Sequence, residues 1–154
     1  MISYLKGDAT APQAKGPKII AHICNDRGGW GKGFVLAVSR RWPEPEQDYR
    51  AWHRYGNDFA LGEIQTVQVL PDTWVCNMIA QHGYKAGSSG PPIRYDALAK
   101  CLSKLADDAG AYKASVHMPK IGSGLAGGDW AKIEPMIALA LNDIPTYVYE
   151  FKGS

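Results

Sequence analysis

The sequence predicts a layered α/β domain built around a mixed sheet. Segments with strand character alternate with segments of helical periodicity, which is the pattern of a sheet covered by helices. One strand is an almost continuous apolar run, as expected for a strand buried on both faces. Two later strands are separated by only a two-residue turn, which indicates an antiparallel hairpin. The sheet is therefore expected to contain both strand directions.

The first part of the chain supplies two strands and two helices. Residues 2–6 alternate between apolar and polar side chains and predict a strand, and residues 18–24 form the apolar run. Residues 34–42 predict a helix that stops at Pro43, because proline disfavours helical geometry in the residue before it. Residues 44–56 predict a second helix, since acidic residues stand at its start and a glycine near its end.

The middle of the chain predicts the hairpin. Residues 62–70 alternate Ile, Thr and Gln against Gln and Val, and residues 73–81 form the partner strand. Pro71 and Asp72 supply the turn between them. Residues 82–93, rich in Gly, Ser and Pro, predict a loop.

The remaining elements follow the same alternation. Residues 94–109 repeat apolar side chains at helical spacing, and residues 114–119 predict a short strand. A final helix is expected over residues 130–141, with Pro135 near its start, where proline is tolerated best. Residues 146–151 close the chain as a strand.

Composition favours one domain over residues 1–154. That length is typical of a single domain, and 45% hydrophobic residues can fill a core. The net charge of +2 and the scattered basic residues disfavour a nucleic-acid partner. No apolar run approaches the roughly 20 residues of a membrane span, so no membrane partner is expected.

The cysteines indicate a reduced chain. Cys24, Cys76 and Cys101 are odd in number and form no CxxC motif, so we interpret them as small packing residues. No segment has the pattern of a secretory signal, and a cytoplasmic location is the simplest expectation. The paired-ligand spacing of a metal site is missing, and neither a metal nor another cofactor is expected.

Two glycine-rich segments carry the functional signal: "HICNDRGGWGKGF" (residues 22–34) and "PKIGSGLAGGDW" (residues 119–130). Each lies between an expected strand and an expected helix, where free backbone N–H groups and the helix dipole favour an anion. Glycine removes the Cβ that would keep a phosphate away. Neither segment has the register of a P-loop or of a dinucleotide-binding fold. Each loop alone could be a surface turn, but together they predict a grip on a pyrophosphate.

The chain resembles the macrodomain family. The segments "YLKGDAT", "AHICNDRGGWGKGF", "MPKIGSGLAGGDW" and "YVYEF" occur in the order and roughly the spacing of that family. The segment "GGWGKGFVLAVSRRWPEPEQDYRAW" is similar to the branch of ADP-ribose-1''-phosphate phosphatases and small ADP-ribosyl-acid hydrolases. The resemblance implies a three-layer α/β/α fold with a mixed, mostly parallel sheet and a crevice for ADP-ribose, whose pyrophosphate the two loops would bind.

The resemblance also implies roles for the two ends of the ligand. Asp8 would accept the exocyclic amine of adenine, or else form a turn or helix cap. Asn25 would hold hydroxyls of the distal ribose, or else only begin a loop. Trp30 would form a wall of the distal ribose site or cover the edge of the core. Phe151 would lie near the adenine or pack in the core.

The two phosphate loops are implied to act mainly through backbone N–H groups. Lys32 would add charge attraction, unless it is simply solvated. The implied loop residues are Gly31, Gly33 and Phe34 in the first loop, and Ile121, Ser123, Gly124, Leu125 and Ala126 in the second.

His22 and Asp26 are the candidate catalytic residues. His22 interrupts an apolar strand just before the first loop, and the phosphatase-like members that the chain resembles carry a histidine there. A histidine could relay a proton or activate water, or it could be a core histidine bonded to backbone. Asp26 would orient His22 or a water molecule. Asp129 is expected to cap the final helix instead.

One departure from the resemblance restricts the chemistry. The acid-ester hydrolases use a lysine where this chain has Gln81 and an aspartate where it has Ala126. Glutamine has no nucleophilic amine, and alanine has no acid or base, so that mechanism is excluded. Lys85 is displaced by four positions and does not replace the missing lysine.

Two functions remain as expectations. The first is a hydrolase that removes the 1''-phosphate from the distal ribose of an ADP-ribose derivative. The alternative is a reader that binds free or protein-linked ADP-ribose without chemistry. Both make ADP-ribose or an ADP-ribosylated protein the partner, and a monomer is expected.

Overall fold

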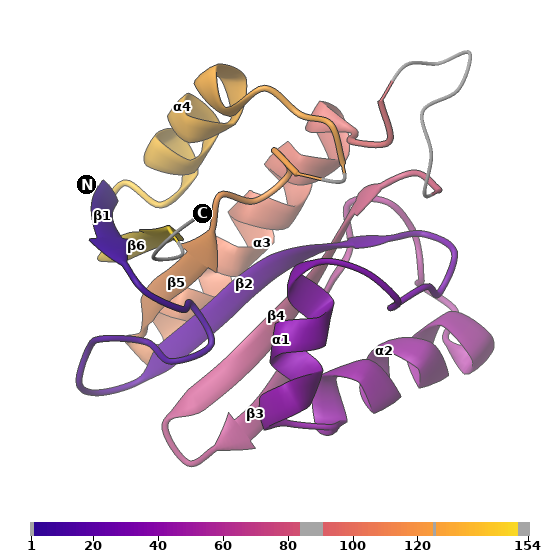
Figure 1. Cartoon of the computed structure of the whole chain (residues 1–154), viewed down its shortest axis with the longest axis horizontal. Coiled ribbons are helices and arrows are strands. Elements are labelled where there is room, and N and C mark those ends of the chain that lie inside the picture. The colour runs from indigo at the N-terminus through magenta and orange to yellow at the C-terminus, as the bar shows by residue number, and fades with distance from the viewer. Residues whose placement is uncertain (1, 84–90, 125, 151–154) are drawn as a thin grey trace.

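The computed structural model describes residues 2–83, 91–124 and 126–150. Its sheet has the strand order β1-β6-β5-β2-β4-β3 (Figure 1). The strands are β1 (Ile2–Lys6), β2 (Lys18–Asn25), β3 (Ile64–Leu70), β4 (Thr73–Gln81), β5 (Ser115–Pro119) and β6 (Thr146–Glu150). The helices are α1 (Phe34–Arg41), α2 (Glu44–Tyr55), α3 (Tyr95–Tyr112) and α4 (Trp130–Ala140).

The sheet is mixed and mostly parallel, as predicted. β3 pairs with β4 in the antiparallel direction, and every other neighbouring pair of strands is parallel. The two-residue connection between β3 and β4 permits only an antiparallel pair, whereas parallel neighbours need a long crossover. The expected hairpin is therefore confirmed.

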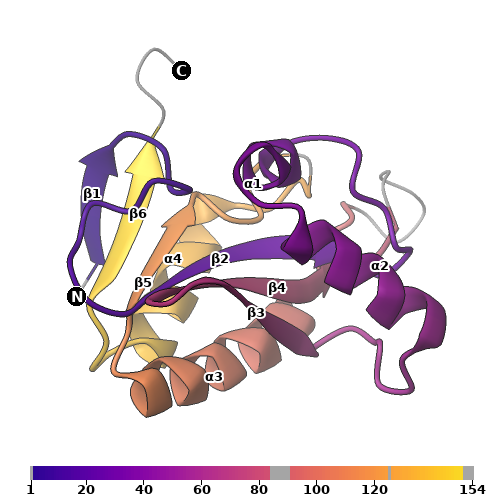
Figure 2. The same ribbon diagram turned by 90° about the horizontal axis from the view of Figure 1, so that it is seen from below.

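Helices cover both faces of the sheet, which confirms the three-layer arrangement. Figure 2 shows α1 and α2 on one face and α3 and α4 on the other. The larger apolar core lies under α3 and α4 and includes Leu98, Leu102 and Ile137. A smaller core lies under α1 and α2 and includes Val38 and Tyr49.

β2 is buried on both faces, as its apolar run predicts. Ile19 and Ala21 belong to the larger core, and Ile20 and Cys24 belong to the smaller one. Because side chains alternate along a strand, His22 lies on the same face as Ile20 and Cys24. The candidate catalytic histidine is thus part of the layer between the sheet and α1.

Two helix details differ from the sequence prediction. α3 continues to Tyr112 and ends at Lys113, whose φ of 54° is left-handed, so the helix closes without a glycine. Pro135 is the sixth residue of α4 and lies inside the helix, so the expectation of a position near its start was wrong. Proline has no N–H to donate, and the carbonyl group of Ala131 loses one helical bond there.

The described cysteines are free and buried, which agrees with a packing role. In residues 2–83, 91–124 and 126–150, no helix is long and apolar enough to span a membrane.

The strand order determines where the glycine-rich loops meet. β2 and β5 are parallel neighbours, so their carboxyl ends reach the same edge of the sheet. The loop after β2 leads to α1, and the loop after β5 leads to α4 (Figure 1). Two segments about 90 positions apart in the sequence therefore lie beside each other, as the strand–loop–helix pattern predicted.

Candidate functional site

Both glycine-rich loops line one cavity of about 300 Å³. Lys32 and Gly33 come from the first loop, and Ile121, Gly122 and Gly124 come from the second. Two lysines, Lys32 and Lys120, are the charged side chains among the described residues of this lining. The geometry therefore offers backbone groups and positive charge to an anion held between the loops.

A second cavity of about 760 Å³ adjoins the first. The two share Ile23, Lys32, Val35 and Gln81 in their walls. Among the described residues of the larger cavity, all the charged side chains are cationic: they are Arg27, Lys32 and Arg50. The two cavities therefore adjoin, and the charged side chains in their described walls are positive.

The first loop delivers α1 to the site without a capping side chain. Gly33 occupies the cap position with φ 82° and ψ −147°, a conformation that favours glycine. Among the residues that the structure describes, no side chain forms a cap hydrogen bond at this helix start. α4 differs, because Asp129 accepts a hydrogen bond from the Ala131 N–H at 3.0 Å, which confirms the expected cap. The start of α1 is thus the better anion site of the two.

The second loop is folded tightly on itself. The N–H of Gly128 donates to the carbonyl oxygen of Gly122 at 2.6 Å, and that of Gly127 donates to Gly124 at 3.0 Å. Gly122 has a φ of 76°, and a Cβ there would lie 2.6 Å from Cδ1 of Ile93. Glycine is therefore required at this position by both backbone conformation and space.

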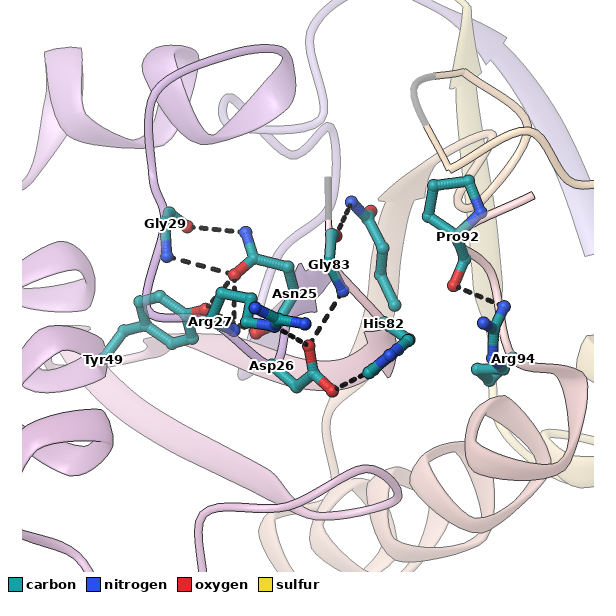
Figure 3. Close-up of polar contacts among 10 residues, drawn as sticks. Asn25, Asp26, Arg27, Gly29, Tyr49, His82, Gly83, Pro92 and Arg94 are labelled. Carbon is teal, nitrogen blue, oxygen red and sulfur yellow. Dashed lines mark hydrogen bonds and ion pairs between the residues drawn. The ribbon is translucent and has the colours of Figure 1, made fainter. Parts of the chain in front are cut away.

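Asn25 holds the first loop together. Its Oδ1 accepts hydrogen bonds from the N–H groups of Arg27 at 2.9 Å and Gly29 at 3.0 Å, and from the Tyr49 hydroxyl at 3.1 Å (Figure 3). Its Nδ2 donates to the Gly29 carbonyl oxygen at 2.9 Å. The loop-forming interpretation therefore describes these contacts, and the contact with a distal ribose stays a prediction.

A second network ties this loop to α1 and α2. Trp30 Nε1 donates to Ser39 Oγ at 2.7 Å, and Ser39 donates to Glu46 Oε1 at 3.0 Å. Arg50 donates to Glu46 Oε2 at 2.9 Å and to the Gly28 carbonyl oxygen at 3.1 Å. Trp30 is buried, which agrees with a position at the edge of the core, and it lines the larger cavity; its place beside a distal ribose stays a prediction. Glu46 and Arg50 were missed, although their i,i+4 spacing on a predicted helix was a signal.

Asp26 does not orient His22, contrary to one expectation. Its Oδ2 accepts a hydrogen bond from His82 Nδ1 at 2.7 Å, and its Oδ1 accepts one from the Gly83 N–H at 2.9 Å (Figure 3). Partial burial raises the pKa of Asp26, but the hydrogen bonds from Gly83 and His82 lower it more, and the net pKa lies below its usual value. Asp26 therefore joins the end of β2 to the end of β4.

His22 lines the smaller cavity and is buried. Its Nε2 lies 2.6 Å from Asn77 Oδ1, and its Nδ1 has no hydrogen-bond partner among the described residues. The Trp30 ring packs edge-on against the imidazole, with the ring centroids 5.3 Å apart. The Phe34 ring packs against it at a tilt, with the centroids 5.7 Å apart. Burial lowers the pKa of His22 to about 4, with a smaller opposing effect of Asn77, so the imidazole is neutral at pH 7.

The adenine end of the predicted site is only partly described. Asp8 Oδ1 accepts hydrogen bonds from the Thr10 N–H at 2.8 Å and from its hydroxyl at 2.7 Å, which is the turn-forming interpretation. Asp8 lines neither cavity. Phe151 and Leu125 lie outside the described residues. The proposed adenine contact therefore stays a prediction.

The positions that depart from the acid-ester hydrolases do lie at the site. Gln81 lines both cavities, and its Nε2 donates to the Gly83 carbonyl oxygen at 2.9 Å. Ala126 lines the smaller cavity. Gly31 lines the larger one, whereas Ser123 is outside both linings and donates to the Lys120 carbonyl oxygen at 2.7 Å. Within the described ranges, no group of three or more His, Cys, Asp or Glu side chains could hold a metal ion.

Comparison with known proteins identifies the family. No protein-family model matches the chain. A solved macrodomain protein from Streptomyces coelicolor is 58% identical to it, with a TM-score of 0.87, and the match covers 97% of this chain and 99% of the other. The chain belongs to the macrodomain family.

Three further relatives have lower sequence identity to this macrodomain. The mouse protein chromodomain-helicase-DNA-binding protein 1-like is 33% identical over 165 residues, which cover 99% of this macrodomain but only 18% of the mouse protein. The ADP-ribose 1''-phosphate phosphatase of Saccharomyces cerevisiae is 25% identical over 97% of this chain and 98% of its own. Thermosipho africanus DarTG, solved in complex with ADP-ribose, shares the fold, with 16% identity and a TM-score of 0.79.

Replacing Gly122 by alanine is expected to destabilise the second loop. The new Cβ would meet Ile93 and force a left-handed backbone, so we expect a loss of about 1–3 kcal/mol in the free energy of unfolding. Urea denaturation measures it. Gly124→Ala is the matched control, because nothing lies within 4 Å of a Cβ there. Equal losses in both variants would contradict the assigned loop geometry.

Acid should destabilise this macrodomain through His22. In the unfolded chain the imidazole binds a proton below about pH 6.5, whereas in the folded protein it stays neutral until about pH 4. The contribution of His22 to the free energy of unfolding is therefore fully present above pH 6.5, and it is lost as the pH drops toward 4. Between pH 7 and 4.5 we expect His22 to contribute a loss of about 2 kcal/mol. Urea denaturation of His22→Gln should show a loss smaller by that amount; an unchanged loss would refute the assignment.

Proposed function

We propose that this macrodomain binds ADP-ribose derivatives and hydrolyses a 1''-phosphate from their distal ribose. The observation that carries the proposal is the pair of adjoining cavities with cationic walls. The smaller cavity lies between the two glycine-rich loops and suits a pyrophosphate, since backbone N–H groups and Lys32 can face its oxygens. The similarity to yeast ADP-ribose 1''-phosphate phosphatase supports this assignment.

The larger cavity suits a second anion beyond the pyrophosphate. Arg27 and Arg50 lie in its wall, and Lys32 stands between the two cavities. Arg50 already pairs with Glu46, and Arg27 lies 3.8 Å from Asp26, so these cations are held in place by acidic partners. A phosphate on the distal ribose would find positive charge there, whereas a neutral ribose would not need it.

His22 is the group proposed to handle the proton. A water oxygen attacks phosphorus, and the bond between phosphorus and the ribose oxygen breaks. His22 Nδ1 takes a proton from the water, the leaving ribose oxygen takes a proton from bulk water, and the imidazolium then returns its proton to bulk water. The products are ADP-ribose and inorganic phosphate. Positioned proton transfer of this kind typically contributes about 10²–10⁴-fold to a rate.

A non-catalytic reader is the second candidate. The pKa of about 4 makes His22 a weak base at neutral pH, and Gln81 offers no nucleophile. A site of this kind could bind ADP-ribose, free or linked to a protein, and leave it intact. The solved complex of DarTG with ADP-ribose supports binding by this fold.

Calorimetry followed by a turnover assay separates the candidates. ADP-ribose should bind more tightly than AMP or ribose-5-phosphate, because under the proposal it alone would occupy both cavities. On ADP-ribose-1''-phosphate, wild-type protein should release phosphate, and His22→Ala should lower kcat by about 10²-fold or more while ADP-ribose still binds.

His117→Gln is the control for that assay. His117 is also buried, but it bonds to Ser115 and Tyr149 away from both cavities, so its loss should leave kcat within about twofold. Binding of ADP-ribose without phosphate release would select the reader. Failure to prefer ADP-ribose over AMP would refute both candidates.

A further inference from the structure

Asn77 is a buried amide that faces the candidate catalytic histidine. It lies in β4, next to β2, and pairs with His22 across the parallel ladder. Its side chain is fully buried, and its Oδ1 lies 2.6 Å from His22 Nε2. Its Nδ2 donates to the carbonyl oxygen of Pro45 at 3.2 Å and to Gln65 Oε1 at 3.1 Å.

These contacts determine which way the amide points. A backbone carbonyl oxygen can only accept a hydrogen bond, so the group beside Pro45 must be the amide nitrogen. Gln65 is held in turn, because its Nε2 donates to the carbonyl oxygen of Asp48 at 3.0 Å and thereby leaves Oε1 for Asn77. The oxygen of Asn77 consequently faces the imidazole.

The amide orientation selects one tautomer of His22. An amide oxygen can only accept, so Nε2 must carry the proton and donate it to Asn77. In a neutral imidazole Nδ1 is then left with a lone pair. The tautomer of His22 is therefore set by two backbone carbonyl groups of α2. The carbonyl of Pro45 orients Asn77 directly, and that of Asp48 orients Asn77 through Gln65.

Nδ1 of His22 is buried without a hydrogen-bond partner. It is the one buried side-chain nitrogen or oxygen atom without a hydrogen-bond partner in the part of the chain that the structure describes. Leaving such an atom unsatisfied costs free energy, because the atom has given up its hydrogen bond to water. A hydrogen-bond donor that reaches Nδ1 from the adjoining cavity would recover that energy.

We propose that Asn77 is a positioning residue for catalysis: it holds His22 as the Nε2–H tautomer and so reserves Nδ1 as the acceptor of the proton from the attacking water. The inference rests on the proposed function and deepens it. As the bond from the water oxygen to phosphorus forms and the bond to the ribose oxygen breaks, the water proton moves to Nδ1. Asn77 then accepts a hydrogen bond from an imidazolium, which releases its Nδ1 proton to bulk water, while the leaving ribose oxygen takes a proton from bulk water.

An amide suits this role because it orients the ring without charging it. A carboxylate at the same distance would favour the imidazolium before substrate binds and would occupy the lone pair on Nδ1 with a proton. The other neighbours of the ring are not charged: Cys24 Sγ lies 3.8 Å from Nε2, and Trp30 and Phe34 pack on the ring from the loop and α1. Tyr49 of α2 donates its hydroxyl to Asn25.

Nuclear magnetic resonance of the wild-type protein tests the tautomer directly. In ¹⁵N-labelled protein at pH 7, long-range proton–nitrogen correlations should show a protonated Nε2 and an unprotonated Nδ1 for His22, identified by the signals lost in His22→Gln. The Nδ1–H tautomer, or a mixture of the two, would overturn the inference. This measurement needs no turnover and no variant of Asn77.

Asn77→Asp tests the role. The carboxylate should raise the pKa of His22 by about 1–3 units, which the same spectra follow by titration. The acidic limb of the kcat profile should move to higher pH by the same amount. Asn77→Leu removes the acceptor, so the tautomers should mix and kcat should fall by about tenfold or more. Thr73→Val, a buried change in the same strand far from His22, should alter neither readout.

The outcomes separate this inference from the function on which it rests. If the wild-type protein releases phosphate but Asn77→Asp keeps the wild-type pH profile, the positioning role is wrong and the phosphatase stands. If the wild-type protein shows the expected tautomer but releases no phosphate, the catalytic role is overturned with the proposed function. If Asn77→Asp does not fold, the tautomer of His22 in the wild-type protein and the kcat of Asn77→Leu still test the positioning role.

Discussion

The parallel pairing of β2 with β5 is the constraint on which the site depends. The two strands are neighbours, so their carboxyl ends bring two glycine-rich loops to one edge of the sheet. Parallel neighbours need crossovers, and α1 and α4 follow the loops on opposite faces. The cavity between the loops therefore results from the topology, and the glycines keep it open.

Polar networks hold the walls of this cavity in place. Asn25 accepts a hydrogen bond from Tyr49 of α2, and Asp26 accepts one from Gly83 just after β4. Trp30 of the first loop donates to Ser39 of α1, which in turn donates to Glu46 of α2. Such bonds within the protein fix the loop before any ligand arrives, which lowers the entropy lost on binding. The same residues would then contribute to recognition mainly by shaping backbone and only partly by touching the ligand.

Sequence periodicity was sufficient for the layers, the hairpin and the two loops, because each depends on local patterns. It failed where a partner lies far away in the chain. Asp26 was expected to orient His22 or a water molecule, but His82, 56 positions later, binds its carboxylate, and the group within hydrogen-bond distance of the imidazole is Asn77. The position of Pro135 within α4 was predicted wrongly. The apolar pattern of this segment does not show that the helix continues on both sides of the proline.

We infer that the two glycine-rich loops hold a diphosphate between their backbone N–H groups. Amide chemical-shift changes on titration with ADP-ribose test it most directly. We expect the largest changes in Gly31–Phe34 and in Ile121–Gly124. Little change is expected at the opposite edge of the sheet around Lys113 and Asp143, where a separate cavity of about 610 Å³ lies. Changes concentrated at that opposite cavity, or in one loop alone, would contradict it.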